Sequence, residues 1–398
     1  LNRIQKTTIF PEAKMKFVIQ RDEINTALQK VVNVIPQRST IPMTQNVKIV
    51  ARGNQLELIT TDLEITMVSH VKADIQEEGE LAIPGRLIND IIKELPNVEL
   101  TFESGNNYRL QLSSDFGQYK IGGENPAEFP QRPTIEAVKE IVMPSPVMRQ
   151  LINKTIFACS SDELRPALTG VFFQIGENRI KTVATDGHRL ATMDYFDDSL
   201  PDESLTSIIS TRALNFVLRS LDSDSIAVMM LGDKHAKFHM ENTELYARLI
   251  DENYVDYNRV IPQESNFELT VNASDFLSSV RRVSLFSNPI TAQVVLELTP
   301  QQMTMRAEDI DYGGEAREQI ACKFTGESLE TGDSLDTGSS FEIGFNSRYL
   351  QTMLKHVDSA EVVLYLVRPD YAVVARPMDG PENEKQLMLL MPIRLEDA

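Results

Sequence analysis

The residues best suited to chemistry lie in one short stretch, Val183–Ala191, which reads Val-Ala-Thr-Asp-Gly-His-Arg-Leu-Ala. Asp186 and His188 could form the acid–base pair of a hydrolase. Candidate nucleophiles for such a pair are Thr185, Ser160 and Ser161. However, no Gly-x-Ser-x-Gly sequence is present, and an Asp-Gly dipeptide between two apolar runs is typical of a tight hairpin turn. We therefore interpret the stretch as a turn between strands and keep a hydrolase as the alternative.

Metal and cofactor sites are not indicated by the sequence. His235 and His239 are four residues apart, which suits a metal on a helix, but Lys234–Met240 alternates like a strand. Cys159 and Cys322 are too few and too far apart for a metal knuckle or a disulfide framework. A glycine-rich phosphate loop with its lysine is also missing. The sequence predicts no metal and no cofactor.

Composition places the chain among ordinary folded proteins, with 398 residues, 42% hydrophobic and 24% charged. It contains no apolar run long enough for a membrane helix and no secretory h-region, so we expect a cytoplasmic protein without a membrane partner. The net charge of −19 argues against binding nucleic acid through bulk charge. An average charge can nevertheless hide a basic face.

Strand and helix patterns recur along the chain in the order strand, helix and three strands. The six copies begin at Phe17, Leu81, Ile141, Ile208, Phe267 and Phe341. Alternate copies lie about 125 residues apart, so two copies make one domain. The sequence thus predicts an α+β protein with three repeated domains, each made of two β-α-β-β-β units, at 15–137, 138–262 and 263–398.

Two segments fall outside this repeat. Residues 1–14 match no copy, and we expect a disordered extension or cloning remnant there. The acidic Gly/Ser-rich stretch Thr325–Ser340 lengthens the last copy, and its composition predicts a flexible surface loop.

Positive charge is concentrated in the six predicted helices, which cover 21–32, 85–94, 146–158, 211–220, 274–286 and 347–356. They hold 12 of the 39 basic residues but only 5 of the 58 acidic ones. Lys and Arg are good helix formers, but Glu is equally good and is scarce here. The pattern favours a basic helical surface that binds a polyanion through phosphate contacts without reading bases.

The C-terminal stretch Leu387–Leu395 is apolar and methionine-rich. One interpretation is a core strand that closes a sheet. The other is that Met391–Leu395 forms the wall of a pocket for a partner peptide, because methionines give an adaptable lining.

Taken together, these features resemble the bacterial sliding clamp family, the β subunit of DNA polymerase III, from Met15 to Leu395. The motifs that carry the resemblance are Thr182–Ala191, Met391–Leu395, Thr61–Glu64, Phe129-Pro130, Asp256–Val260 and Gly344–Asn346. The resemblance implies a DNA-clamp fold in which helices line the inside and sheets the outside of a ring. It implies a head-to-tail homodimer that encircles duplex DNA, lacks catalytic activity, and needs a separate loader.

A cleft for partner peptides between the second and third domains is also implied by the resemblance. Its partners would be the polymerase III catalytic subunit, the clamp loader and other proteins with a short clamp-binding peptide. The matching positions are Leu168, Thr185, Gly187, His188, Arg189, Leu190, Arg259, Val260, Asn346, Tyr349, Met391, Pro392, Ile393, Arg394 and Leu395. The chain departs from the family pattern at Pro166-Ala167, at Val255 and in the final Glu396–Ala398.

The resemblance also assigns DNA and subunit contacts. It places Arg38, Arg86, Arg212 and Arg219 against DNA, and the helix charges add Arg149, Lys154, Arg281 and Arg348. Subunit contacts are expected to join Tyr119 and Ile121 of one chain to Leu285 and Phe286 of the other. A scaffold that binds only proteins remains a further alternative, and it predicts no salt-sensitive binding to DNA.

Overall fold

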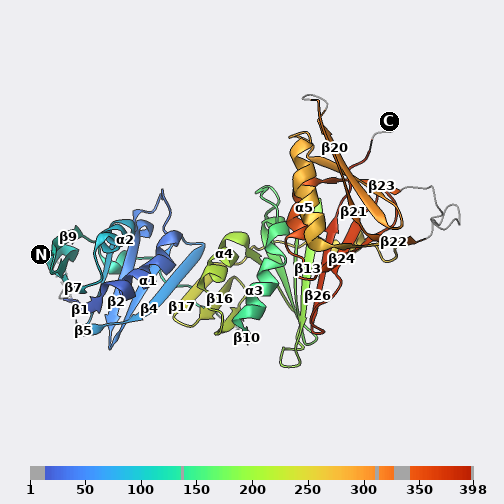
Figure 1. Cartoon of the computed structure of the whole chain (residues 1–398). Helices are drawn as coiled ribbons and strands as arrows, with labels where there is room; N and C mark the ends of the chain where they lie inside the picture. The colour runs from blue at the N-terminus through green and yellow to red at the C-terminus, as the bar shows by residue number, and fades with distance from the viewer. Residues whose placement is uncertain (1–13, 136–138, 310–312, 327–340, 396–398) are drawn as a thin grey trace, which may run out of the picture. The chain divides into compact units, whose positions relative to one another are not determined.

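The computed structural model describes residues 14–135, 139–309, 313–326 and 341–395 (Figure 1). These residues form two compact units. The first unit comprises Leu1–Pro146 with Arg212–Leu249, and the second comprises Val147–Thr211 with Ile250–Ala398. The predictions for residues 1–13 and 327–340 lie outside the described residues.

The first unit contains two antiparallel sheets. Its five-stranded sheet has the order β5-β1-β7-β8-β9 and its eight-stranded sheet the order β10-β15-β16-β17-β4-β3-β2-β6. The strands of the first sheet are β5 (Asp74–Glu77), β1 (Lys16–Gln20), β7 (Glu99–Ser104), β8 (Arg109–Ser114) and β9 (Gly117–Gly122). Those of the second are β10 (Lys139–Pro144), β15 (Ile226–Leu231), β16 (His235–Met240), β17 (Thr243–Arg248), β4 (Ile65–Lys72), β3 (Gln55–Thr61), β2 (Asn46–Arg52) and β6 (Gly79–Pro84).

Helices α1 (Arg21–Val31) and α2 (Gly85–Glu94) pack against each other in this unit. Each buries one apolar stripe, as the spacing of Ile24, Leu28 and Val31 in α1 requires. Helix α4 (Thr211–Ser220) follows the same rule and buries Leu214 and Val217. The stripes leave Arg86, Lys93, Arg212 and Arg219 exposed, whereas Arg21 of α1 is only 18% exposed and donates to the Ile92 carbonyl of α2.

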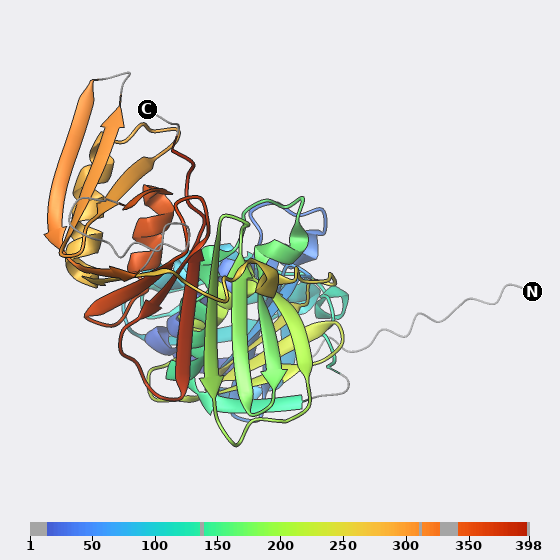
Figure 2. The same cartoon turned by 90° about the vertical axis from the view of Figure 1, so that its right-hand side faces the viewer.

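The second unit is built in the same way. Its nine-stranded sheet has the order β14-β11-β12-β13-β26-β25-β24-β18-β22, and its four-stranded sheet the order β21-β20-β19-β23. Figure 2 shows β11, β12 and β13 in green beside the red strand β26. The strands of the larger sheet are β14 (Leu205–Ser210), β11 (Gly170–Gly176), β12 (Arg179–Thr185), β13 (Arg189–Phe196), β26 (Glu384–Leu390), β25 (Val373–Pro377), β24 (Glu361–Leu366), β18 (Phe267–Asn272) and β22 (Lys323–Gly326). The smaller sheet has β21 (Gly314–Ala321), β20 (Gln302–Asp309), β19 (Gln293–Leu298) and β23 (Phe341–Asn346).

Helices α5 (Ala273–Val283) and α6 (Ser347–Leu354) pack together in the second unit, and α3 (Ser145–Asn153) completes the set of six. All six predicted helices are present among the described residues. The helices predicted at 146–158 and 274–286 end earlier than expected, because their last turns are 3-10 segments at Ile156–Ala158 and Ser284–Phe286.

Three strand predictions need correction. The short edge strands β5 and β22 were not expected, and Thr325 and Gly326 belong to β22 rather than to a loop. The last strand ends at Leu390 instead of running to Leu395. Pro392 lacks the backbone N–H that a continued ladder needs. None of the helices in the described ranges is long and apolar enough to cross a membrane.

A half-buried polar network joins the segment before β10 to the eight-stranded sheet. Arg132 pairs with Glu57 of β3 (Nη2–Oε2 2.6 Å), and Glu244 of β17 accepts from Lys237 Nζ (3.0 Å) and the Tyr246 hydroxyl (2.8 Å). Burial alone would raise the pKa of Glu244, but the hydrogen bonds from Lys237 and Tyr246 and the nearby cations lower it below its usual range.

We expect Glu244→Gln to lower the free energy of unfolding by about 2 kcal/mol at pH 7, because Lys237 loses its charged partner and Arg132 loses the second of its two carboxylate partners (Nη1–Oε2 3.6 Å). A carboxylate whose pKa is lower in the folded state stabilises above its unfolded pKa of about 4.3. The difference between the two proteins should therefore be constant near neutral pH and shrink as the pH falls below about 4. Urea unfolding at several pH values checks this.

The matched control is Glu80→Gln. Glu80 pairs with Lys48 (3.0 Å), but its side chain is 36% exposed, and such surface pairs contribute little. Equal stability losses in the two variants would contradict the proposed role of Glu244.

Candidate functional site

The turn at Thr185–Arg189 is ordered by its own side chains. Thr185 Oγ1 donates to the Arg189 carbonyl (2.6 Å) and accepts from the Gly187 N–H (3.1 Å). Asp186 Oδ1 accepts from the N–H groups of His188 and Arg189 (2.9 and 3.0 Å), and its Oδ2 pairs with Arg189 Nε (3.0 Å). Gly187 has φ +92°, which favours glycine. The predicted hairpin turn is confirmed.

This geometry leaves no catalytic pair. The Asp186 carboxylate is committed to two backbone N–H groups and to Arg189, whereas the exposed His188 ring stacks on Tyr349 at 6.1 Å. Burial raises the pKa of the neighbouring Cys159 thiol to about 12, so this thiol is not a ready nucleophile. These side-chain contacts instead hold the turn in one conformation.

Arg189 connects the turn to helix α6. Its guanidinium lies 4.7 Å from the ring centre of Tyr349 and 5.8 Å from that of Phe157. Asn346 caps α6 by accepting from the N–H groups of Arg348 (3.0 Å) and Tyr349 (3.4 Å). Cap, cation–π contact and ion pair therefore fix Tyr349 and Arg189 with respect to each other.

The C-terminal segment Met391–Leu395 joins the same group. The Met391 N–H donates to the His188 carbonyl (2.9 Å), and the Ile393 N–H donates to the Gly344 carbonyl (2.8 Å). A Cβ on Gly344 would lie 2.8 Å from Leu395 Cδ2 and 3.1 Å from the Ile393 carbonyl oxygen, so a larger residue there would displace the Leu395 side chain. The Met391 side chain is 39% exposed. The segment thus continues the surface formed by the turn and α6.

Two further segments, each containing predicted peptide contacts, lie beside this turn. Tyr257 is buried in one cluster with Val183 and Leu190, and it anchors the 3-10 turn Tyr257–Val260, in which Val260 is half-exposed. Arg165 lies 3.6 Å from the position of a Cβ on Gly187 and precedes the turn Pro166–Thr169 that carries the buried Leu168.

Sequence reasoning missed Arg165 and Phe157, which contact the turn, and Tyr257, which supports it. Arg165 and Phe157 stand in loops or short 3-10 turns. No periodicity or motif in the sequence distinguishes such residues from other loop residues.

Four of the predicted DNA-contacting arginines lie in the first unit. Arg86 donates to the Ile35 carbonyl (2.7 Å), and Arg212 donates to the neighbouring Val34 carbonyl (3.5 Å). Arg38 is exposed three residues further along the same segment. Arg219 is exposed on α4 about two helical turns from Arg212, and both guanidinium groups lie near the Phe216 ring (5.9 and 5.8 Å).

In the second unit, Arg281 and Arg348 are exposed and Arg149 is partly exposed. Arg348 donates to the Pro289 carbonyl (2.7 Å). Lys154 does not fit the predicted set, because it is only 6% exposed. Its ammonium is held by the His356 carbonyl (2.6 Å) and the Asp358 carboxylate (2.5 Å). We therefore remove Lys154 from the proposed DNA contacts.

The predicted subunit contacts likewise include both exposed and buried side chains. Leu285 is 81% and Phe286 44% exposed, which is unusual for such large apolar side chains. Tyr119 is partly exposed, but Ile121 is 3% exposed and belongs to the core of the first unit. The Ile121 side chain is therefore unavailable to a partner, although β9, which carries it, is an edge strand.

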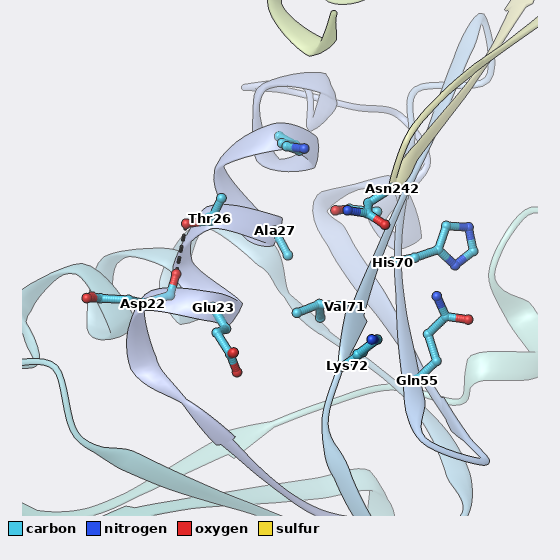
Figure 3. A pocket seen from close by; sticks show the side chains of 11 residues that line it. Asp22, Glu23, Thr26, Ala27, Gln55, His70, Val71, Lys72 and Asn242 are labelled. Atoms are coloured by element: carbon cyan, nitrogen blue, oxygen red, sulfur yellow. Dashed lines mark hydrogen bonds between the residues drawn. The ribbon is translucent and has the colours of Figure 1, made fainter. Parts of the chain in front are cut away.

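A separate pocket of about 520 Å³ lies between α1 and strands β3 and β4 (Figure 3). Its walls carry charges of both signs, from Asp22, Glu23, Lys30 and Lys72. None of the predicted site residues lines it. Across the described part of the chain, no group of three or more His, Cys, Asp or Glu residues is placed to hold a metal ion.

Comparisons with known proteins place this geometry in a family. Three family models of the DNA polymerase III beta subunit match the chain: the N-terminal domain at residues 15–133, the central domain at 142–256 and the C-terminal domain at 258–333. The beta sliding clamp of Chlamydia trachomatis is 30% identical, over 96% of this chain and 88% of the relative. That of Bacillus subtilis is 29% identical, over 96% and 100%.

Solved structures agree. The sliding clamp from Bacillus subtilis superimposes with a TM-score of 0.89 at 26% identity, and the DNA polymerase III subunit beta from Pseudomonas aeruginosa with 0.88 at 25%. Each comparison covers 96% of this chain and 100% of the solved chain. The fold is therefore the α+β DNA-clamp fold, that of a processivity factor without catalytic activity.

The chain belongs to the beta sliding clamp family, the β subunit of DNA polymerase III. It acts in DNA replication as a ring-shaped clamp that keeps the polymerase on duplex DNA. The resemblance seen in the sequence is confirmed.

Proposed function

We propose that the surface around the Thr185–Arg189 turn binds the short peptides of clamp partners, among them the polymerase III catalytic subunit and the clamp loader. The observation that carries this proposal is the convergence of the turn, the start of α6 and Met391–Leu395, through the bonds from Met391 to His188 and from Ile393 to Gly344. Half-exposed apolar side chains beside fixed polar groups suit a short apolar peptide.

The proposed peptide contacts are Gly187, His188, Arg189, Arg259, Val260, Asn346, Tyr349 and Met391–Leu395, to which we add Arg165. The predicted residues Leu168, Thr185 and Leu190 are buried (6%, 7% and 2% exposed), so we assign them to the support of this surface rather than to direct contact. Met391 and Val260 offer exposed apolar surface (39% and 50%). Their positions next to the cationic Arg189 and Arg259 favour a peptide that combines bulky apolar groups with hydrogen-bond acceptors.

For DNA we propose contacts through Arg38, Arg86, Arg149, Arg212, Arg219, Arg281 and Arg348. What supports this is that all are at least partly exposed, in a chain whose overall charge is −19. Binding through phosphates alone is independent of sequence, as a sliding protein requires.

We also propose a cytoplasmic head-to-tail homodimer of three-domain chains, with the domains at 15–137, 138–262 and 263–398. This interface is supported by β9 and β21, which are edge strands in the described part of the chain, and by the exposed side chains of Leu285 and Phe286. A head-to-tail contact between different surfaces closes into a ring when the rotation permits.

The dimer proposal is tested by Leu285→Glu. We expect the dissociation constant to rise by about 100-fold or more, since an apolar anchor is lost and an unpaired carboxylate is buried, at about 3–5 kcal/mol. Sedimentation velocity over a range of concentrations measures it. Leu164→Glu is the control, because Leu164 is 91% exposed but is no predicted contact. An unchanged dimer in the Leu285 variant would contradict the proposed interface.

A further inference from the structure

The turn at Thr61–Ile65 has the same set of threonine and aspartate hydrogen bonds to the backbone as the turn at Thr185–Arg189. Thr61 Oγ1 donates to the Ile65 carbonyl (3.1 Å) and accepts from the Leu63 N–H (3.1 Å). Asp62 Oδ1 accepts from the N–H groups of Glu64 and Ile65 (3.0 and 2.7 Å). Leu63, at the position of Gly187, has φ +79°. Such a backbone is strained for leucine, so the turn is held against a local cost.

The two turns use their aspartate in the same way. In each, one carboxylate oxygen binds the backbone of the turn and the other binds an arginine. Asp186 Oδ2 holds Arg189 of its own strand, whereas Asp62 Oδ2 pairs with Arg212 of helix α4. The chain therefore has an arginine-binding aspartate in two equivalent turns. One of them, Asp62, binds the proposed DNA contact Arg212.

The Asp62 carboxylate cannot easily leave Arg212. Its side chain is 9% exposed and is fixed by two backbone hydrogen bonds. The Arg212 side chain, in contrast, is 50% exposed and can turn toward solvent. A phosphate that approaches Arg212 must therefore compete with a carboxylate that is already in place, and both ligands offer oxygen acceptors to the same guanidinium.

We propose that Asp62 competes with the phosphate groups of DNA for Arg212 and so limits how tightly Arg212 holds the duplex. This inference rests on the proposed role of Arg212 in DNA binding. An exposed arginine without such a partner neutralises a phosphate fully, which raises affinity. An arginine that returns to Asp62 after each encounter releases the strand, which suits a protein that must slide along DNA.

The test is Asp62→Asn in the full-length protein. The side-chain oxygen of the introduced asparagine still accepts the two backbone hydrogen bonds, but the charge opposite Arg212 is gone. With a short fluorescent duplex as the probe, we expect tighter binding, and a plot of log affinity against log salt concentration that is steeper by about 0.9, the value for one additional phosphate contact. On long DNA, we expect the diffusion coefficient of loaded clamps to fall.

Glu64→Gln is the matched control. Glu64 lies in the same turn, and its substitution changes the net charge by the same amount. It pairs, however, with Arg248 (3.3 Å), which is no proposed DNA contact. Equal effects of both variants would show general electrostatics and overturn the proposal, as would weaker binding by the Asp62 variant, which would make Asp62 an aid to Arg212.

Arg212→Ala separates this inference from the proposed function. If this variant binds DNA as tightly as the parent, the proposed DNA contact itself is wrong. If it binds more weakly while Asp62→Asn has no effect, only the competitor role fails. The double variant Asp62→Asn/Arg212→Ala should bind no more tightly than Arg212→Ala alone, because Asp62 acts through Arg212.

Discussion

Deletion of Met391–Leu395 is expected to reduce the affinity for a polymerase-derived clamp-binding peptide by about 100-fold or more. The segment contributes the half-exposed Met391 and holds Leu395 against Gly344. Each large apolar group that a peptide buries contributes about 1.5–3 kcal/mol, and each 1.4 kcal/mol is a factor of ten in affinity. Isothermal titration with a peptide from the catalytic subunit measures the loss.

The control deletes only Glu396–Ala398 and should keep the parental affinity. The deletion of Met391–Leu395 should leave the protein folded, because β26 ends at Leu390 and the nine-stranded sheet does not include the deleted segment; circular dichroism checks this. If the peptide binds both truncated proteins as tightly as the full chain, the peptide site lies elsewhere.

Reversal of two charges, Arg212→Glu with Arg219→Glu, is expected to weaken DNA binding by about 10- to 100-fold near physiological salt. The loss of two phosphate contacts should also lower the slope of log affinity against log salt by about 1.8. Both side chains are exposed on α4, but Arg212→Glu places a carboxylate opposite the fixed Asp62 carboxylate, so circular dichroism must first show that the variant is folded. Fluorescence anisotropy over a salt series gives affinity and slope together.

Arg52→Glu with Lys72→Glu provides the matched control. These residues are exposed on β2 and β4 of the same unit, and their reversal changes the net charge equally. We expect a much smaller loss of affinity and little change in the slope. A loss as large as that of the helix variant would indicate that bulk charge, rather than the helix surface, governs DNA binding.

The sequence predicted the architecture well because its periodicities are strong. Ile24, Leu28 and Val31 mark the buried stripe of α1, and the same order of elements recurs six times. Helix ends were less accurate, since the step from α-helix to a 3-10 turn after Asn153 or Val283 leaves no clear signal in residue type. The edge strands β5 and β22 are too short to show alternation.

For the candidate site, residue types alone were misleading in three instructive cases. Asp186 and His188 left catalysis open as an alternative to the expected turn, but the Asp186 carboxylate is used to build that turn. Lys154 counted as a helix charge, yet it is buried against His356 and Asp358. Ile121 alternates correctly with Tyr119 but faces the core. Each outcome depends on tertiary neighbours far along the chain, which a local pattern does not contain.

Encirclement is the property that lets this protein hold DNA and still slide along it. The most direct measurement loads the clamp onto nicked circular DNA with a matching loader, cuts the circle once, and quantifies the protein that stays bound. We expect retention on the circle and rapid loss after the cut, because a ring slides off a free end. Continued retention on the linear DNA would contradict encirclement and would indicate ordinary surface binding.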